Sequence, residues 1–371
     1  MRNRHNKQKQ LESPFEYLRR KDGSAFEADV ILNWYKAHAY VMDKLKEVAF
    51  GPDSRDHLHV VLCGDSPRML SVARQVALLS HFANFDDEAD DALKNRTVIT
   101  VVSQKPDIVA ELEKEEYLCN LPKYCKLTVR NEQPQNVNSY VDIEIRVVDA
   151  CETDNNDQCV LVTEEEVKAF FDANNSDDVC KIDTRKAVLA SRIYDLGTLV
   201  DNLPYEDIHN PRRYAVALDF FQYDLLQKKV GPLVNDSRWK NSLMTVKGGL
   251  SNVFCSDCFE FRAREVALCG NRGGNPWEVY NVTLSKSEHA RWVVDKLIMG
   301  FRPLNEKERY QEECLFGSEK MQYRKMLKNN AKDPVHIDLC SYRDLRRVDP
   351  DCLKYDNFLM LSIPGILDKV K

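Results

Sequence analysis

The sequence predicts an α/β fold in which a doubly wound parallel sheet is followed by a mainly helical segment. The first observation is a short, wholly apolar stretch, Leu58–Cys63, typical of a strand buried on both faces of a parallel sheet. The second is the regular alternation of such strands with helical segments, which parallel sheets require. The third is the glycine-rich run Gly270–Pro276, a strong breaker that separates this region from a helix-rich remainder.

The expected elements begin with a helix near the N-terminus. Apolar residues recur at spacings of three and four over Phe26–Phe50, which predicts a helix that Gly51–Pro52 ends. After the first strand, the turn Gly64–Pro67 leads into a second helical pattern over Met69–Phe82, and this order opens a βαβ unit. Further strands are expected at Thr97–Val102, Ile143–Val148 and Cys159–Val162, and further helices around Asp107–Tyr117, at Glu164–Phe171 and at Tyr214–Leu226.

Composition and charge exclude several classes of function. The chain has 43% hydrophobic and 30% charged residues, the balance of a globular protein. Its net charge of −6 argues against a chain-wide surface for nucleic acid. No apolar stretch approaches the roughly 20 residues of a spanning helix, which excludes a channel or transporter and predicts no membrane insertion. Met1–Glu12 is polar and basic and does not resemble a secretory signal, so we expect a cytoplasmic protein.

Twelve cysteines raise the question of a metal site or disulfides. Cys255 and Cys258 alone form a C-x-x-C pair, and no second pair follows at the spacing of a zinc ribbon or finger. The sequence therefore predicts no metal site, and the cysteines are interpreted as reduced, mostly buried thiols.

The turn after the first strand is the candidate cofactor site. A strand–glycine–helix junction presents backbone N–H groups and a helix dipole to a phosphate, which makes Gly64, Ser66 and Arg68 candidate nucleotide-binding residues. Of the dinucleotide fingerprint G-x-G-x-x-G, however, only the first glycine is present; Met69 stands at the third position, and Asp65 would repel a phosphate. This pattern predicts a degenerate Rossmann-like sheet that serves as scaffold or dimerisation unit, or that holds a different nucleotide.

The best-marked helix lies in the C-terminal segment. Ser285 and Glu288 have the spacing of a capping box, and Gly300 ends the helix. His289 and Trp292 are three residues apart and therefore neighbours on its surface. Composition and periodicity alone favour a buried His–Trp pair whose imidazole bonds a backbone carbonyl.

Motifs in this segment resemble the ryanodine-receptor-type (RyR) repeat. They are E-H-x-R-W at Glu288–Trp292, Gly300–Phe301, then His336, Leu339, Tyr342 and Leu345 at spacings of three, and finally Lys354–Asp356. Two positions depart from the family pattern: Ile337 stands where proline is common, and Asn357 where arginine is common. The missing arginine puts in doubt any ligand contact that it would make.

A weaker resemblance extends over most of the chain. Leu250–Asn252 and Arg262–Val266 resemble bacterial proteins that join one RyR repeat to a Rossmann-like nucleotide-binding domain, similar to those of potassium-transport regulators. In calcium-release channels these repeats are cytoplasmic modules outside the pore, so channel activity is not implied. The channel repeats pair in tandem, and a chain with one repeat could restore the pair as a homodimer.

The resemblance implies a sensor or effector that binds a small, nucleotide-derived molecule, with that nucleotide as the possible cofactor. For such a ligand we assign Trp292, Phe301 and Tyr342 to stacking, and Arg291, Arg302 and His336 to phosphate. Of the six, Arg302 and His336 are expected to face solvent, because they lie at a helix end and in a turn.

The expected domains are a helical N-terminal segment (1–55), a Rossmann-like domain (56–213), a helical bridge (214–275) and the RyR domain (276–371). The chain contains no G-x-S-x-G, P-loop, H-E-x-x-H or deaminase motif, so no catalytic residue is predicted and a binding protein is favoured over an enzyme. Two alternatives stay open: an NAD(P)- or nucleotide-using enzyme on the Rossmann-like domain, and a protein–protein interaction module.

Overall fold

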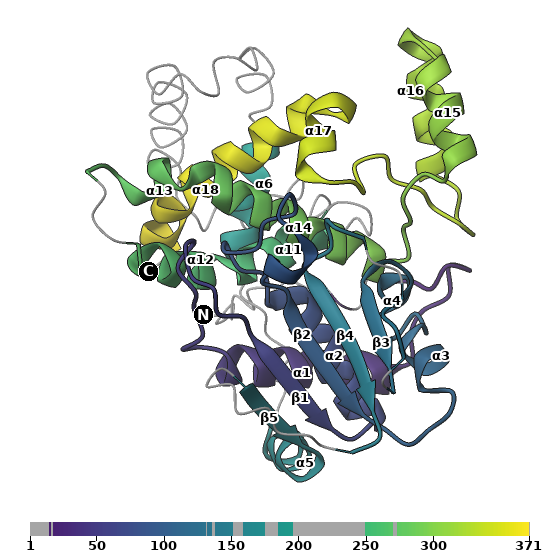
Figure 1. The fold of residues 1–371 in the computed structure, drawn as a ribbon, viewed down its shortest axis with the longest axis vertical. Helices are drawn as coiled ribbons and strands as arrows, with labels where there is room; N and C mark the ends of the chain where they lie inside the picture. The colour runs from purple at the N-terminus through teal and green to yellow at the C-terminus, as the bar shows by residue number, and fades with distance from the viewer. Residues whose placement is uncertain are drawn as a thin grey trace, which may run out of the picture.

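A computed structural model describes residue 15 and residues 18–130, 132–135, 138–150, 159–174, 185–195, 249–269 and 273–370. Within these ranges the chain forms an α/β fold with an all-parallel sheet and many helices (Figure 1). The helix expected over Tyr214–Leu226 lies outside them. None of the described helices has the combination of length and apolar character needed to cross a bilayer.

The sheet has five parallel strands in the order β3-β4-β2-β1-β5. They are β1 (His59–Cys63), β2 (Thr97–Val102), β3 (Lys126–Val129), β4 (Ile143–Val148) and β5 (Cys159–Thr163). The register pairs Val60 with Ile99 on one side and with Val160 on the other. The strand order therefore reverses at β1 and β5, and the carboxyl ends of two such strands are the usual ligand position in open α/β sheets.

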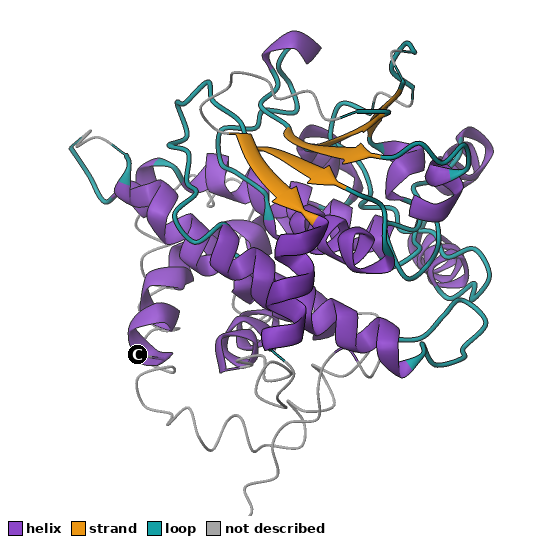
Figure 2. Ribbon diagram, turned by 90° about the horizontal axis from the view of Figure 1, so that it is seen from below, coloured by secondary structure: helices purple, strands orange, loops and turns teal. Residues whose placement is uncertain are grey.

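The two faces of the sheet differ in polarity. Side chains alternate along each strand, and one face presents Val60, Ile99 and Ile145 to the helix layer. The opposite face carries polar groups: His59 Nε2 lies 2.8 Å from the hydroxyl of Thr100. Figure 2 shows the helices gathered beneath the sheet, with loops above it.

Four of these five strands coincide with the predicted ones to within one residue. The sequence analysis missed β3, which lies at the edge of the sheet and in which Leu127 alone is fully buried. An edge strand of this kind has no continuous apolar run, so the pattern that predicted the inner strands is missing there.

The helices around the sheet are α1 (Ala28–Lys44), α2 (Pro67–Leu79), α3 (Ile108–Leu112), α4 (Leu121–Tyr124) and α5 (Glu164–Ala173), with a short 3₁₀ turn at Asp91–Leu93. The start of α2 is set by Ser66, whose Oγ accepts the N–H of Met69, and by Pro67 at the first helical position. The helix expected around Asp107–Tyr117 is shorter than predicted. After α3 the chain turns, and the N–H of Leu118 donates to the carbonyl of Leu112 at 2.9 Å.

The remaining described helices form a second assembly beside the sheet (Figure 1). They are α6 (Arg185–Asp195), α11 (Gly249–Asp257), α12 (Phe259–Ala267), α13 (Pro276–Val279), α14 (Asn281–Ile298), α15 (Glu306–Cys314), α16 (Gly317–Lys328), α17 (Tyr342–Val348) and α18 (Pro350–Val370). The long helices α14 and α18 pack against each other, and α18 also packs on α6 and α17.

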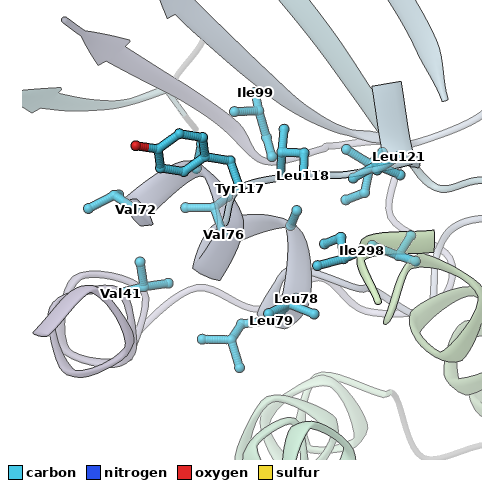
Figure 3. Packing of buried hydrophobic residues seen from close by; sticks show 14 of the residues in the cluster. Val41, Val72, Val76, Leu78, Leu79, Ile99, Tyr117, Leu118, Leu121 and Ile298 are labelled. Atoms are coloured by element: carbon cyan, nitrogen blue, oxygen red, sulfur yellow. The ribbon is translucent and has the colours of Figure 1, made fainter. Parts of the chain in front are cut away.

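Helix α14 belongs to both assemblies. Its residues Val293, Val294, Leu297 and Ile298 lie in the hydrophobic cluster that fills the space beneath the sheet, and Figure 3 shows Ile298 beside the residues of α2. Leu284, in the first turn of the same helix, lies in the hydrophobic cluster around α18. The segment 276–371 therefore shares its core with the α/β part, and the expected boundaries at 55, 213 and 275 stay predictions.

The predicted capping box at Ser285 is wrong. Helix α14 begins at Asn281, one turn earlier, and the hydroxyl of Ser285 donates to the carbonyl of Asn281 within the helix at 2.8 Å. Glu288, the expected partner in the box, instead pairs with Arg291. The predicted helix end is confirmed, because Gly300 has φ +87°, the left-handed conformation that glycine adopts most easily.

Candidate functional site

A cavity of about 260 Å³ lies where α14 and α18 meet the ends of α16 and α17. Helix α14 contributes His289 and Trp292, one turn apart, to its wall, and α18 contributes Cys352, Tyr355 and Asp356 from one face. The rest of the wall is formed by Lys328, His336, Asp338 and Asp349. The volume is close to the lower end of the range of roughly 300–1,000 Å³ found for small-molecule sites.

Two buried histidines stand on this wall, and their bonds fix their tautomers. His289 Nε2 lies 2.9 Å from the carbonyl oxygen of Cys340; because a carbonyl only accepts, the proton is on Nε2. At His336 the other ring nitrogen decides, since Nδ1 accepts the backbone N–H of Asp338 at 3.4 Å, which again leaves the proton on Nε2. Burial lowers the pKa of His289 to about 4, and burial together with the charge of Lys328 holds the pKa of His336 well below its ordinary value.

The cavity is also acidic. Burial, reinforced by the charge of Asp349, raises the pKa of Asp338 to about 7. Burial and the nearby Glu288 raise the pKa of Asp356 well above its ordinary value. One carboxyl oxygen of Asp338, Oδ1, is buried without a hydrogen-bond partner. Lys328 is the one lysine or arginine on the described wall, and the two histidines are held neutral by burial, so carboxyl groups are the main polar groups there.

Of the residues predicted to bind a ligand, the structure brings Trp292 and His336 to the cavity wall. Their rings meet edge to face with centroids 4.8 Å apart. His336 was expected to face solvent, and this expectation is wrong, because the residue is only 8% exposed. Phe301 and Tyr342 lie behind the wall: the Phe301 ring packs on His336 at 5.9 Å, and the Tyr342 ring packs on His289 at 5.9 Å.

The two arginines assigned to phosphate lie away from the cavity and are neutralised within the chain. Arg291 is 1% exposed, and its Nη2 lies 2.8 Å from Glu288 Oε1. Arg302 binds two carboxylates, with Nη1 at 2.7 Å from Glu308 and Nη2 at 2.7 Å from Asp333. Neither guanidinium lines the cavity.

Several residues of the wall were not assigned by the sequence. Tyr355 and Asp356 were recognised as motif positions, but no role in the site was given to them. Asp338, Asp349 and Cys352 were missed, although Asp349 and Cys352 form a D-x-x-C pair at the start of α18. Asn357, which replaces the usual arginine, is a packing residue whose amide donates to the carbonyl of Leu353 at 2.7 Å.

The turn after β1 is the second candidate site, proposed for a nucleotide phosphate, and a carboxylate of the chain itself binds to it. Glu164, the first residue of α5, accepts the backbone N–H of Ser66 at 3.1 Å on Oε1 and the Ser66 hydroxyl at 2.7 Å on Oε2. A phosphate bound at the start of α2 would need this position. Glycine is required at residue 64, because φ is +146° and a Cβ would come within 2.6 Å of Glu164 Cγ.

The charges around this turn are also paired within the chain. Arg68 Nη1 lies 3.6 Å from Asp172 Oδ1, and its guanidinium lies 5.7 Å from the centre of the Phe171 ring. Asp65 accepts the hydroxyl of Ser103 and lies 2.7 Å from Lys105 Nζ. The assignment of Gly64, Ser66 and Arg68 to a nucleotide stays a prediction, with which the Glu164 carboxylate competes.

The C-x-x-C pair lies in the core. Cys255 and Cys258 are 2% and 0% exposed, and the thiol of Cys258 donates to the carbonyl of Leu79 at 3.7 Å. Burial raises the pKa of Cys258 to about 12, which keeps the thiol protonated. Seven of the described cysteines are free thiols, namely Cys119, Cys125, Cys255, Cys258, Cys314, Cys340 and Cys352.

Comparison with known proteins adds no family to this geometry, because no family model, curated protein or solved structure matches the chain. The resemblance to the RyR repeat stays a prediction, and so do the site residues inferred from it.

Proposed function

We propose that this chain is a ligand-binding protein of the RyR-repeat type, whose cavity between α14 and α18 takes a nucleoside or a nucleoside monophosphate. The observation that carries the proposal is the pairing, in one cavity of about 260 Å³, of aromatic rings with buried carboxyl groups. Concave sites with an apolar wall and a few convergent polar groups are the usual small-molecule sites of proteins.

The wall suits an amino-bearing heteroaromatic ring. Trp292 is half-buried and stands on the wall, so one of its edges or faces is available to a flat ligand. Stacking of a nucleobase on an aromatic side chain contributes about 1–3 kcal/mol. The carboxyl oxygens of Asp356 can accept hydrogen bonds from exocyclic amines, which adenine, guanine and cytosine carry.

The charge of the wall limits the number of phosphates. Lys328 is the single lysine or arginine among the described lining residues, beside the carboxyl groups of Asp338, Asp349 and Asp356. A triphosphate would bring several negative charges to a wall with one lysine, whereas a nucleoside or one phosphate beside Lys328 would not. We therefore expect nucleosides and monophosphates to bind more tightly than triphosphates.

Thermal unfolding of the full chain, with isothermal titration as the direct measurement, tests the proposal. The probes are adenosine, guanosine and cytidine with their monophosphates, cyclic monophosphates and triphosphates. A ligand that binds the folded state stabilises the protein by about 2.7 kcal/mol at a free ligand concentration of 100 times Kd, so the melting temperature of the protein rises. No shift and no binding heat with any of these compounds would refute the proposal.

Two tryptophans make a matched pair of variants. Trp292→Leu should weaken binding by about tenfold to a hundredfold, since it removes the stacking surface. Trp277→Leu, at another half-buried tryptophan, on α13 and outside the cavity wall, should leave the affinity unchanged. Equal losses in the two variants would place the ligand elsewhere.

For the sheet we propose the role of a Rossmann-like scaffold. The reversal of strand order at β1 and β5 supports this assignment. The Glu164 carboxylate at the start of α2 favours a scaffold over a second nucleotide site, because it occupies the place of a phosphate.

We also propose a homodimer, as expected for a chain with one repeat. Figure 1 shows the hairpin of α15 and α16 projecting from the body. Large apolar side chains on it are exposed to solvent, namely Tyr310, Phe316, Met321 and Met326. Large apolar side chains exposed on a projecting hairpin are candidates for an interaction surface, and we assign this hairpin to the dimer contact.

A further inference from the structure

Three metal-ligating side chains converge at one corner of the cavity. The ligand atoms of Asp338, Asp349 and Cys352 all lie within 4.8 Å of one another. Asp338 precedes α17, while Asp349 and Cys352 belong to the junction of α17 and α18, so the fold brings them together from two segments. All three line the cavity of about 260 Å³, which gives an ion a path of entry.

No described lysine or arginine lies within ion-pair distance of either carboxylate; the basic side chain beside Asp338 is His336, whose Nδ1 lies 3.5 Å from Asp338 Oδ2. Asp338 is only 5% exposed, and its Oδ1 has no hydrogen-bond partner. Buried polar groups are almost always satisfied, and an orphaned carboxyl oxygen beside a second carboxylate and a thiol indicates a cation that all three would share.

The distance between the sulfur of Cys352 and a carboxyl oxygen of Asp338 is the one expected for two ligands of a zinc ion. Cys352 Sγ lies 3.6 Å from Asp338 Oδ2. Zn–S bonds of about 2.3 Å and Zn–O bonds of about 2.1 Å, joined at the tetrahedral angle, place sulfur and oxygen about 3.6 Å apart. A shift of the side chains would therefore not be needed along this edge.

We infer that Asp338, Asp349 and Cys352 bind a divalent transition metal of the zinc type, with the fourth position open to the cavity. The sulfur ligand selects zinc over magnesium and calcium, which take oxygen ligands. Three protein ligands with one open position are the arrangement of zinc sites that bind a further ligand, rather than of closed structural sites. The three ligands and Trp292 line the same cavity, but Trp292 contributes no ligand to the metal.

Metal titration of the full-length protein, stripped with a chelator beforehand, tests the inference. We expect one Zn²⁺ per chain by isothermal titration and elemental analysis, and no comparable binding of Mg²⁺ or Ca²⁺. Co²⁺ should give the charge-transfer absorption of a cobalt–thiolate bond and the strong visible bands of a tetrahedral site. Neither readout depends on any ligand of the protein.

Matched variants locate the site. Cys352→Ser and Asp349→Asn should each weaken Zn²⁺ binding by at least about 100-fold, more than the loss of an outer partner costs. Asp351→Asn removes a neighbouring exposed carboxylate that pairs with Lys354 at 2.6 Å, and Cys314→Ser removes an exposed thiol; both should bind normally.

Three results would overturn the inference. They are the absence of Zn²⁺ binding by the wild-type protein, a cobalt–thiolate band that persists in Cys352→Ser, and equal losses in Asp349→Asn and Asp351→Asn. If either of the two site variants fails to fold, as judged by circular dichroism, the other carries the test, since each removes a different ligand. Tight binding of Mg²⁺ or Ca²⁺ in place of Zn²⁺ would refute the zinc assignment.

Discussion

The burial of His289 predicts a loss of stability in acid that one substitution removes. Its ring stacks beside Trp292 and meets Tyr342 edge to face, and its Nε2–H donates to the carbonyl of Cys340 at 2.9 Å. Burial lowers the pKa of His289 from 6.5 to about 4, although the carbonyl and the charge of Glu288 oppose the shift.

The sign and size of the effect follow from this pKa. The folded protein keeps His289 neutral down to a pH of about 4, whereas the unfolded chain takes up a proton below about 6.5. The contribution of His289 is therefore fully present above pH 6.5 and is lost as the pH falls toward 4. Between about pH 7.5 and pH 5 the free energy of unfolding falls by about 2 kcal/mol on its account.

Urea unfolding of the wild-type protein and of His289→Gln at these two pH values measures the effect. Glutamine retains an N–H donor for the Cys340 carbonyl but does not titrate, so the free energy of unfolding of this variant should fall by about 2 kcal/mol less than that of the wild-type protein. His57→Gln, at a half-buried histidine outside the cavity wall, is the control. The same pH dependence in wild-type protein and His289→Gln would refute the argument.

Three further outcomes are expected. Arg291→Met leaves Glu288 buried without its partner, so the free energy of unfolding measured in urea should fall by about 3–5 kcal/mol. The ligand affinity should not change; a reduced affinity at full stability would contradict this expectation. Glu164→Ala removes the acceptor of two hydrogen bonds from Ser66, so the free energy of unfolding should fall by about 0.5–1.5 kcal/mol. Sulfate should then raise the melting temperature of this variant more than that of the wild-type protein, because the start of α2 is open to an anion. Native mass spectrometry should show two chains per particle and, for Phe316→Ser, one; a wild-type monomer would contradict the dimer.

The strands were predictable where burial leaves a continuous apolar pattern. β1 and β2 lie inside the sheet, and their sequences read as largely apolar runs. β4 also lies inside it, and its buried Ile143, Ile145 and Val147 alternate with Glu144 and Arg146. β3 lies at the edge, and of its four residues Leu127 alone is buried, a pattern too short to distinguish from a loop. The start of α14 was misplaced because Ser285 was interpreted as a cap, whereas its hydroxyl is satisfied one turn back.

Helical spacing identified the part of the site that lies on one element, and the resemblance to the RyR repeat added His336 from another segment. His289 and Trp292 are one turn apart on α14, so helical spacing alone identifies them as neighbours, and the expected bond from His289 to a backbone carbonyl is confirmed. Asp338 and Asp349 come from separate segments and meet only in the folded chain. No spacing pattern in the sequence predicts that these two residues come together.

The arginines show why the charge of the ligand could not be inferred from the sequence. Basic residues near an aromatic motif suggest a phosphate site. Arg291, however, is already paired with Glu288, and Arg302 with two carboxylates, so the positive charge of each is neutralised within the chain. Asp338 and Asp356 are the reverse case, since they are buried on the cavity wall and no described lysine or arginine is paired with either of them. Burying a carboxyl group without a cationic partner costs free energy that a hydrogen-bond donor or a cation can recover. At this end of the cavity we therefore expect an amino-bearing ring or a metal ion rather than a polyphosphate.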